Sequence, residues 1–164
     1  LRRPADVLFL PYIVGTNAPE FDLDACGMFY GLRSKHDAFD LALAVMEGVA
    51  HLLKKNCDRI LASGTPIERI IATGGGAKSA LWCQLQADIT GIPVSIPVEK
   101  EAACLGAAMI GATSAGVYAD VSEAANTAVR LEATFVPQAD EQNERKHRQF
   151  VALYEAMINA QRMP

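Results

Sequence analysis

The sequence predicts an α/β fold, in which helices flank a parallel or mixed sheet. Two observations favour this class. Short apolar runs of strand length alternate with longer segments whose apolar residues recur at helical spacing. Three consecutive glycines, Gly74 to Gly76, stand between one such run and the next helical segment, a pattern typical of a tight strand-to-helix turn. The chain has 164 residues, of which 51% are hydrophobic, so we expect a single domain over residues 1–164.

The first part of the chain predicts a strand, a long loop and a long helix. Val7 to Leu10 is a short apolar run that Pro11 ends. Residues 12–35 are rich in Gly, Asn, Asp and Pro and are interrupted by the apolar patch Met28-Phe29-Tyr30, so we expect a loop-rich stretch that is functional or clasped against a neighbour. A helix capped by Asp37 should run to Ala62 and end at Ser63-Gly64. Its apolar face would carry Leu41, Val45, Gly48, Val49 and Leu52.

The remaining elements follow from the same periodicities. The segment from Ala102 to Ala115 consists mostly of small residues, so we expect a helix there that packs closely on another backbone. The expected strands are Ile67 to Ala72 and Pro93 to Pro97, with an extended return from Val129 to Val136. The expected helices are Leu81 to Thr90, Ala102 to Ala115, Tyr118 to Asn126 and Ala139 to Gln161, the last with a stripe of Phe150, Leu153, Tyr154, Met157 and Ile158.

The glycine segment is the candidate binding site. Its backbone can be approached without meeting a Cβ atom, and the helix that follows should present unpaired N–H groups beside Lys78. Such a corner suits a nucleotide or another anion, while tight packing alone is the alternative. A Walker loop is excluded because Ala77 precedes Lys78-Ser79, and a dinucleotide fingerprint because Ser79 replaces its third glycine.

Four motifs in this order resemble those of the FGGY carbohydrate kinases, particularly the xylulose kinases, and cover nearly the whole chain. The first is Leu10-Pro11-Tyr12 with Gly15, Ala18-Pro19, Asp22, Ala25, Gly27 and Phe29-Tyr30-Gly31-Leu32, and the second is Glu47-Gly48-Val49-Ala50. The third is Gly74-Gly75-Gly76-Ala77-Lys78-Ser79 with Leu81-Trp82, Gln84 and Ala87-Asp88-Ile89, and the fourth is Glu101 to Ala108.

The resemblance implies the C-terminal lobe of the actin-like, ribonuclease-H-like ATPase architecture. It also implies that Gly75 and Gly76 lie against the nucleotide and that Ser79 is the polar contact near the base. Gly74, Ala77 and Lys78 would flank them.

The function implied by the resemblance is ATP-dependent phosphorylation of a ketopentose or related sugar. The catalytic aspartate, both phosphate loops and most of the Mg²⁺ contacts would lie outside these residues, so no catalytic residue and no metal ligand is assigned here. The start at Leu1 in place of Met likewise indicates a fragment, inactive alone, whose partner is the N-terminal lobe of the same kinase. The sugar stays open because Gly15 to Pro19 departs from the Gly-Glu-Arg-x-Pro common in xylulose kinases, and a homodimer stays open too. The alternative is a nucleotide-binding or interaction module without chemistry.

Composition excludes several other classes. The net charge of −4 gives no basic surface for nucleic acid, and no apolar run is long enough for a membrane span. The four cysteines form no Cys-x-x-Cys pair, which favours neither a zinc site nor a redox motif. Reduced thiols in a cytoplasmic protein are the simplest interpretation.

Several other polar or aromatic residues are interpreted as structural. Glu47 should have a hydrogen-bond partner in the core, and His51 should be a satisfied or a surface histidine. Trp82 and Gln84 could border an adenine, but core positions are favoured. The charged run from Asp140 to Arg148 predicts a solvated face, and Glu99-Lys100-Glu101 a solvated helix cap.

Overall fold

The computed structural model describes residues 6–17 and 20–162. Ala18-Pro19 of the first motif lie outside the described residues. The chain divides into two compact units. Unit 1 comprises the residues up to Ile67, residues 88–91 and the residues from Gln138 onward, and unit 2 comprises residues 68–87 and 92–137. Each unit is described by itself.

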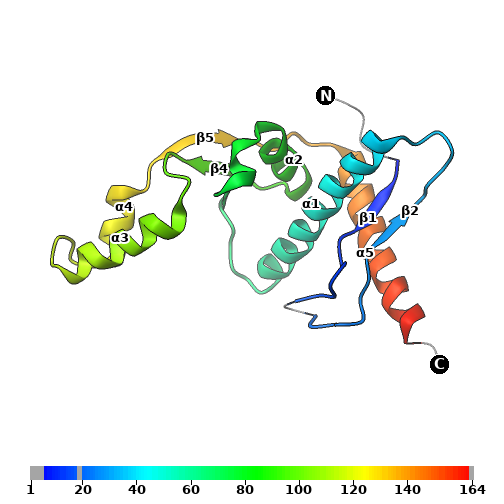
Figure 1. The fold of residues 1–164 in the computed structure, drawn as a ribbon, viewed down its shortest axis with the longest axis horizontal. Coiled ribbons are helices and arrows are strands. Elements are labelled where there is room, and N and C mark those ends of the chain that lie inside the picture. The colour runs from blue at the N-terminus through cyan, green and yellow to red at the C-terminus, as the bar shows by residue number, and fades with distance from the viewer. Residues whose placement is uncertain (1–5, 18–19, 163–164) are drawn as a thin grey trace. The chain divides into compact units, whose positions relative to one another are not determined.

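Unit 1 joins two long helices to a two-stranded sheet (Figure 1). Strand β1 (Leu8–Leu10) pairs antiparallel with β2 (Met28–Tyr30) and packs on helices α1 (Ala38–Ala62) and α5 (Glu141–Gln161). The expected strand and both expected helices are confirmed. The apolar patch at Met28-Phe29-Tyr30, which interrupts the expected loop of residues 12–35, forms β2. Long-range pairing makes it a strand: the rings of Phe9 and Phe29 lie 4.5 Å apart across the two strands.

Local side chains define the start of α1 as the sequence predicts. The Asp37 carboxylate accepts hydrogen bonds from the backbone N–H groups of Phe39 and Asp40, and the Asp40 carboxylate accepts one from the Asp37 N–H. This reciprocal capping box satisfies amide donors that the first helical turn leaves unpaired. At the other end Gly64 has a φ of 87°, which suits a glycine just beyond a helix.

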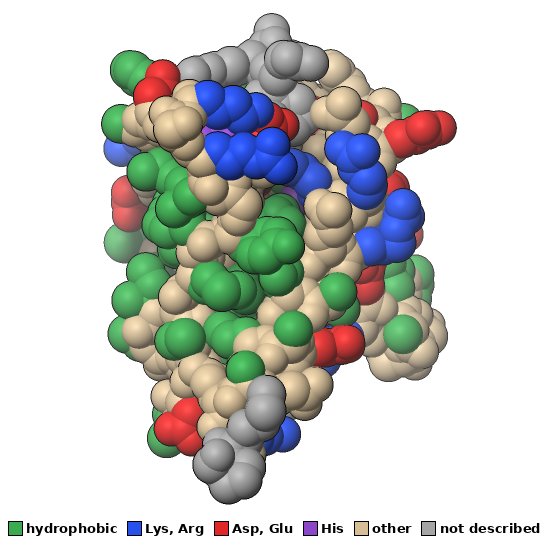
Figure 2. Space-filling view, turned by 90° about the vertical axis from the view of Figure 1, so that its right-hand side faces the viewer, with side chains coloured by type: hydrophobic (Ala, Val, Ile, Leu, Met, Phe, Trp, Pro, Cys, Tyr) green, Lys and Arg blue, Asp and Glu red, His purple; other side chains and the backbone are tan. Residues whose placement is uncertain are grey.

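The core of unit 1 lies between α1, α5 and the segment around β1. Buried Leu10, Tyr12 and Ala25 pack with the apolar stripe of α5, namely Phe150, Tyr154, Met157 and Ile158. The predicted stripe is thereby confirmed. Other apolar side chains stay at the surface, and Figure 2 shows hydrophobic side chains gathered on one face of unit 1 beside a group of Lys and Arg. Exposed examples in this unit include Ile13, Val14, Phe21 and Leu23.

Unit 2 contains a three-stranded mixed sheet in the order β3-β4-β5, which confirms the predicted sheet type. β3 (Ile70–Ile71) runs parallel to β4 (Val94–Pro97), and β5 (Leu131–Phe135) pairs antiparallel with β4. Helix α2 (Ala80–Thr90) begins in this unit after a short 3₁₀ turn, η1 (Gly75–Lys78). The small core consists of Ala77, Cys83, Ala87, Val94 and Ile96.

The two remaining helices of unit 2, α3 (Ala102–Ser114) and α4 (Val121–Ala128), lie side by side (Figure 1). Asp120 caps α4 by accepting a hydrogen bond from the Glu123 N–H. The expected close packing of the small residues of α3 is wrong for this structure, because α3 has no buried residue. An ideal Cβ added at Gly106 or Gly111 would meet nothing within 4 Å.

Candidate nucleotide-binding corner

The glycine segment of unit 2 follows the short strand β3, which pairs with β4, the central strand of the sheet. The Ile70 N–H donates to the Pro93 carbonyl at 2.8 Å, and the Ala72 N–H donates to the Ser95 carbonyl at 2.9 Å. The chain is therefore tied to β4 up to Ala72, only two residues before the first glycine. Beyond that point Ala77 is buried in the core of unit 2. The segment between Ala72 and Ala77 is held at both ends.

Gly74 turns the chain out of the strand. Its φ of 68° and ψ of −154° lie in a region that side chains with a Cβ rarely adopt, so the turn requires glycine here. The Gly74 N–H donates to the Lys100 carbonyl at 3.2 Å, which fixes the turn against the segment after β4.

The helix that follows begins one residue before the predicted start at Leu81. Helix α2 begins at Ala80, and the 3₁₀ turn η1 takes up residues 75–78 between the glycine turn and this helix. Ser79 joins the two, since its hydroxyl accepts the Trp82 N–H at 3.3 Å and its carbonyl accepts the Cys83 N–H at 3.0 Å. The N–H groups directly after the glycines therefore belong to a 3₁₀ turn and not to the expected helix, and the Trp82 N–H at the start of α2 already has a partner.

The six candidate residues form one continuous corner, but they differ in what they expose. Gly75, Gly76, Lys78 and Ser79 are exposed, Gly74 is half-buried, and the Ala77 side chain is buried. Ala77 can therefore meet a ligand only through its backbone. Lys78 supplies the positive charge of the corner.

Trp82 lies beside the glycines and not in the core. A Cβ placed on Gly76 would lie 3.3 Å from the Cδ1 and Nε1 atoms of the Trp82 indole, and Trp82 is half-buried. The core interpretation of Trp82 is therefore wrong. Gln84 is half-buried as well, and its side-chain amide donates to the Val136 carbonyl at 2.9 Å, which ties α2 to the segment after β5.

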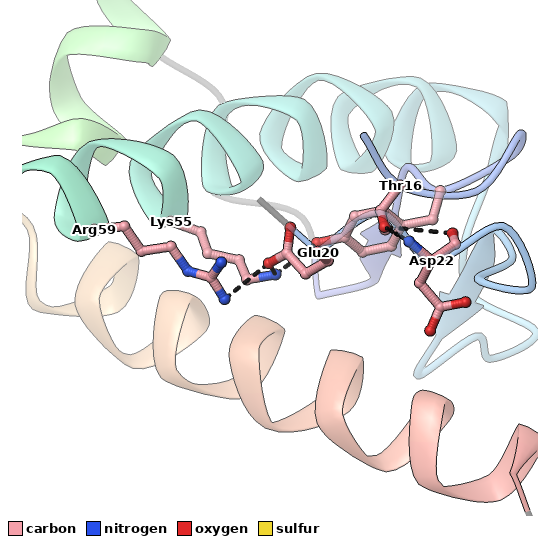
Figure 3. A network of polar contacts seen from close by, with 6 residues as sticks. Thr16, Glu20, Asp22, Lys55 and Arg59 are labelled. Atoms are coloured by element: carbon pink, nitrogen blue, oxygen red, sulfur yellow. Dashed lines mark hydrogen bonds and ion pairs between the residues drawn. The ribbon is translucent and has the colours of Figure 1, made fainter. Parts of the chain in front are cut away.

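A second polar assembly lies in unit 1, where it holds the loop before β2. Figure 3 shows Glu20 between the cationic side chains of Lys55 and Arg59, at 2.6 Å and 2.8 Å. The Lys55 ammonium also lies 3.5 Å from the ring centroid of Tyr154. Burial lowers the pKa of Lys55, while the hydrogen bond that its ammonium donates to Glu20 opposes that shift. Glu20 thus clasps the loop onto α1, which was one of the two expectations from the length of the loop.

The sequence gives no signal for a buried ionic seam between α1 and α5. Lys146 pairs with Glu47, and both side chains are buried. The prediction that Glu47 has a core partner is confirmed. The predicted solvated face of residues 140–148 is wrong at Lys146 and His147, which are both buried. Residues 99 positions apart form the pair, so no local spacing could indicate it.

His51 also departs from expectation. It is fully buried on α1, and neither ring nitrogen has a hydrogen-bond partner. Its ring lies 5.6 Å from that of His147 and 5.8 Å from that of Phe150. Burial lowers the pKa of His51 to about 3, helped by the nearby His147, Lys146 and Lys54. The ring therefore stays neutral inside the seam.

The described residues contain neither a candidate metal centre nor a helix suited to a membrane. Within residues 6–17 and 20–162, no group of three or more His, Cys, Asp or Glu could hold a metal ion. No helix in that part of the chain is long and apolar enough to cross a membrane. All four cysteines are free thiols, with Cys57 and Cys83 buried and Cys26 and Cys104 exposed.

Comparison with known proteins decides the family. The model of the C-terminal domain of the FGGY family of carbohydrate kinases matches residues 2–115, well over half of the chain. The chain belongs to this family. The FGGY match extends over parts of both units, and the resemblance inferred from the four motifs is confirmed.

Individual relatives agree with this assignment. A xylulose kinase of Staphylococcus epidermidis is 30% identical over 151 residues, which is 92% of this chain and 30% of that protein. The solved structure of xylulose kinase from Rhodospirillum rubrum superimposes with a TM-score of 0.81 at 27% identity, covering 99% of this chain and 33% of that one. The fold is that of the C-terminal lobe of these kinases, and the chain spans about a third of their length.

A glycerol kinase of Plasmodium falciparum, solved with ADP, shares the fold as well. It superimposes with a TM-score of 0.76 at 21% identity, over 98% of this chain and 32% of that one.

Proposed function

We propose that the chain is the nucleotide-side part of an ATP-dependent kinase that phosphorylates a hydroxyl group of a ketopentose or a related sugar. Both units would belong to the one C-terminal domain of that kinase, which the family match across both of them supports. The observation that carries the proposal is the exposed, side-chain-free backbone at Gly75.

The three glycines have different reasons to be glycine, and this difference points to a ligand. Gly74 needs its positive φ, and Gly76 has the Trp82 indole where a Cβ would come to 3.3 Å. Gly75 has neither constraint, because its φ is not positive and a Cβ there would meet nothing within 4 Å. Folding does not explain its missing side chain. A ligand that lies directly on the backbone does.

The neighbouring residues fit a nucleotide on this surface. The hydroxyl of Ser79 accepts the Trp82 N–H, so its own hydrogen is left to donate to an acceptor on the base. Gly75 and Gly76 would lie against the adenosine, flanked by Gly74, by the backbone of Ala77 and by the exposed Lys78. The ADP in the glycerol kinase structure supports a nucleotide as the ligand of this fold.

The residues of this chain would bind and orient the nucleotide, and ATP would supply the phosphoryl group. Phosphoryl transfer depends on positioning and charge stabilisation, so a displaced nucleotide should cost most of the activity. We place the catalytic aspartate and the main Mg²⁺ contacts in the part of the full-length kinase outside these residues. The N-terminal lobe would complete the cleft, and the 164 residues alone should be inactive.

The sugar class rests on the relatives. The Staphylococcus and Rhodospirillum proteins are xylulose kinases, which favours a ketopentose, whereas the Plasmodium protein is a glycerol kinase. Residues 15–19 differ from the pattern common in xylulose kinases, so the test must include other acceptors.

The test is coupled ADP release by the full-length parent protein with pentuloses, hexuloses, polyols and gluconate, with the 164-residue chain as the control. Turnover of one acceptor by the parent alone would support the proposal and identify the substrate. If the parent binds ATP but turns over no acceptor in the panel, the proposal fails and a nucleotide-binding module without chemistry takes its place.

A further inference from the structure

Unit 1 contains a hollow with a strongly basic lining, which we call the basic pocket. Its volume is about 590 Å³, and pockets that bind small molecules in proteins measure about 300–1,000 Å³. One acidic residue, Asp6, lies in its lining together with four cationic residues, which are Arg33, Lys35, Arg145 and Lys146. The whole chain carries a net charge of −4, so this local excess of positive charge runs against the composition of the protein.

Two structured segments carry these cations. The first is the turn between β2 and α1, where the Arg33 N–H donates to the His36 Nδ1 atom at 2.9 Å and the Arg33 carbonyl accepts the His36 N–H at 3.1 Å. The second is the N-terminal part of α5, where the lining residues recur at helical spacing on one stripe: Gln142, Arg145, Lys146 and Gln149. The fold itself therefore brings the cations together.

Two of the four cations already have carboxylate partners. Lys35 pairs with Asp6 at the surface, and Lys146 pairs with Glu47. The Lys146 side chain is only 9% exposed and still lines the basic pocket, so the pocket reaches down to the buried pair between α1 and α5. These two pairs shape the pocket and contribute little net charge to it.

The other two cations, Arg33 and Arg145, are exposed and have no carboxylate partner in the described part of the chain. Arg145 also borders a neighbouring hollow with Glu141 and Glu144, yet it forms an ion pair with neither of these two described residues. A guanidinium presents its N–H donors in a planar fork that matches two oxygen atoms of one anion. The basic pocket therefore holds two unpaired anion-binding groups.

The rest of the lining suits hydroxyl groups. The Tyr30 hydroxyl and the side-chain amides of Gln142 and Gln149 can each donate and accept hydrogen bonds, as the hydroxyls of sugars and polyols do. Leu8 is the one aliphatic residue in the described lining. A ligand that matches this lining is polar, anionic and rich in hydroxyl groups.

We propose that the basic pocket is a binding site for a phosphate monoester of a small sugar or polyol. The phosphate group carries close to two negative charges at neutral pH, which the guanidinium groups of Arg33 and Arg145 match better than they match a single carboxylate. The hydroxyl groups of the ligand would pair with Tyr30, Gln142 and Gln149. All these residues belong to unit 1, whereas the glycine corner belongs to unit 2, so binding here requires neither ATP nor turnover.

Isothermal titration calorimetry of the 164-residue chain tests the ligand class. Ribose 5-phosphate and glycerol 3-phosphate are the probes, and inorganic phosphate, ribose and gluconate are titrated separately. At least one of the two esters should bind at one site per chain, at least about tenfold more tightly than inorganic phosphate or gluconate, because each added hydrogen bond to a charged group is worth about that factor. Ribose should not bind. Absence of saturable ester binding, or equally tight binding of phosphate or gluconate, would overturn the proposal.

Glutamine substitutions locate the site. The double variant Arg33→Gln/Arg145→Gln should weaken ester binding at least about tenfold, because it removes both charged donors and keeps polar side chains. Arg148→Gln is the matched control, since Arg148 is an exposed arginine of the same helix that does not line the basic pocket. Circular dichroism verifies that each variant is folded. Equal weakening in the control would show a general effect of charge and would contradict the proposal.

Arginine modification by phenylglyoxal, followed by peptide mapping, needs no variant. The bound ester should slow the modification of Arg33 and Arg145 and leave that of Arg148 unchanged, and protection of all three or of none would overturn the proposal. These results are independent of the kinase assay. A parent that turns over an acceptor while the chain binds no ester refutes the basic pocket and retains the proposed function, and the converse result refutes only the proposed function.

Discussion

Two helices of this chain place glycine in their interior for opposite reasons. At Gly48 of α1, a Cβ would lie 2.3 Å from the carbonyl oxygen of Phe9, so the helix and β1 touch backbone to backbone. At Gly106 and Gly111 of α3, a Cβ would meet nothing within 4 Å. Gly48 therefore allows close packing in unit 1, whereas the two glycines of α3 in unit 2 have open space where a Cβ would lie. Unit 1 has its packing partners within the chain, and unit 2 keeps a bare backbone and an apolar helix exposed.

The largest expected effect is at the buried ionic seam of unit 1. Lys146→Met should lower the free energy of unfolding by about 3–5 kcal/mol, because it leaves the Glu47 carboxylate buried without its ammonium partner. Urea unfolding of the 164-residue chain measures this loss. Lys35→Met is the matched control, because the Lys35–Asp6 pair is exposed and should contribute at most about 1 kcal/mol. Similar losses in both variants would show that burial does not distinguish the two pairs.

The next effect is at the close contact of α1 with β1. Gly48→Ala should lower the free energy of unfolding by about 1–3 kcal/mol, although alanine favours helices, because its methyl group overlaps the Phe9 carbonyl. Thermal unfolding by circular dichroism measures the change. A stabilised Gly48→Ala variant would mean that β1 does not pack on α1 at this point.

The buried histidines should make unit 1 sensitive to acid. His51 has a pKa of about 3 in the folded chain and about 6.5 in the unfolded chain, so only the unfolded state binds the proton between these values. His51 is faced by Lys54 of α1 and by Lys146 and His147 of α5, which also disfavour its protonation. His51 should leave the free energy of unfolding unchanged above pH 6.5 and should lower it by about 1.4 kcal/mol per pH unit below that value.

Urea unfolding between pH 7 and pH 5 measures this slope. His51→Leu should reduce the slope by about 1.4 kcal/mol per pH unit, the contribution of one proton. Identical slopes in the wild type and His51→Leu would exclude a neutral, buried His51.

The smallest expected effect has the opposite sign. Gly106→Ala in the 164-residue chain should raise the free energy of unfolding by about 0.5–1 kcal/mol, since the helix gains propensity and the methyl group meets open space. Chemical unfolding monitored by circular dichroism measures it. A loss of stability would indicate that α3 already packs against something within the chain.

The sequence predicts well those features that neighbouring residues create. The cap at Asp37 was predictable because its carboxylate accepts N–H groups only two and three residues ahead. The turn at Gly74 was predictable from the sequence because a backbone with positive φ favours glycine. All six candidate residues of the corner are contiguous, so the sequence alone places them together.

Features that depend on distant residues could not be predicted. Strand β2 exists because residues 28–30 pair with residues 8–10, and the two apolar triplets carry no signal of that pairing. Lys146 lies in a charged run that is typical of a solvated face, yet it pairs with Glu47 in the core. The 3₁₀ turn over residues 75–78 carries no local signal either, since its Ala77 is buried against distant residues in the core of unit 2.

The proposed contact of nucleotide with the bare backbone of unit 2 is tested most directly by the Michaelis constant of the full-length parent for ATP in a Gly75→Leu variant. Leucine at this position meets no protein atom near its Cβ in this chain, so folding should be retained and a change should report the ligand. Thr127→Leu, on the exposed side of α4, is the control for an added surface side chain. We predict that the Michaelis constant rises at least about tenfold, equivalent to roughly 1.4 kcal/mol, in Gly75→Leu alone. An unchanged Michaelis constant in a folded, active Gly75→Leu variant would contradict the account.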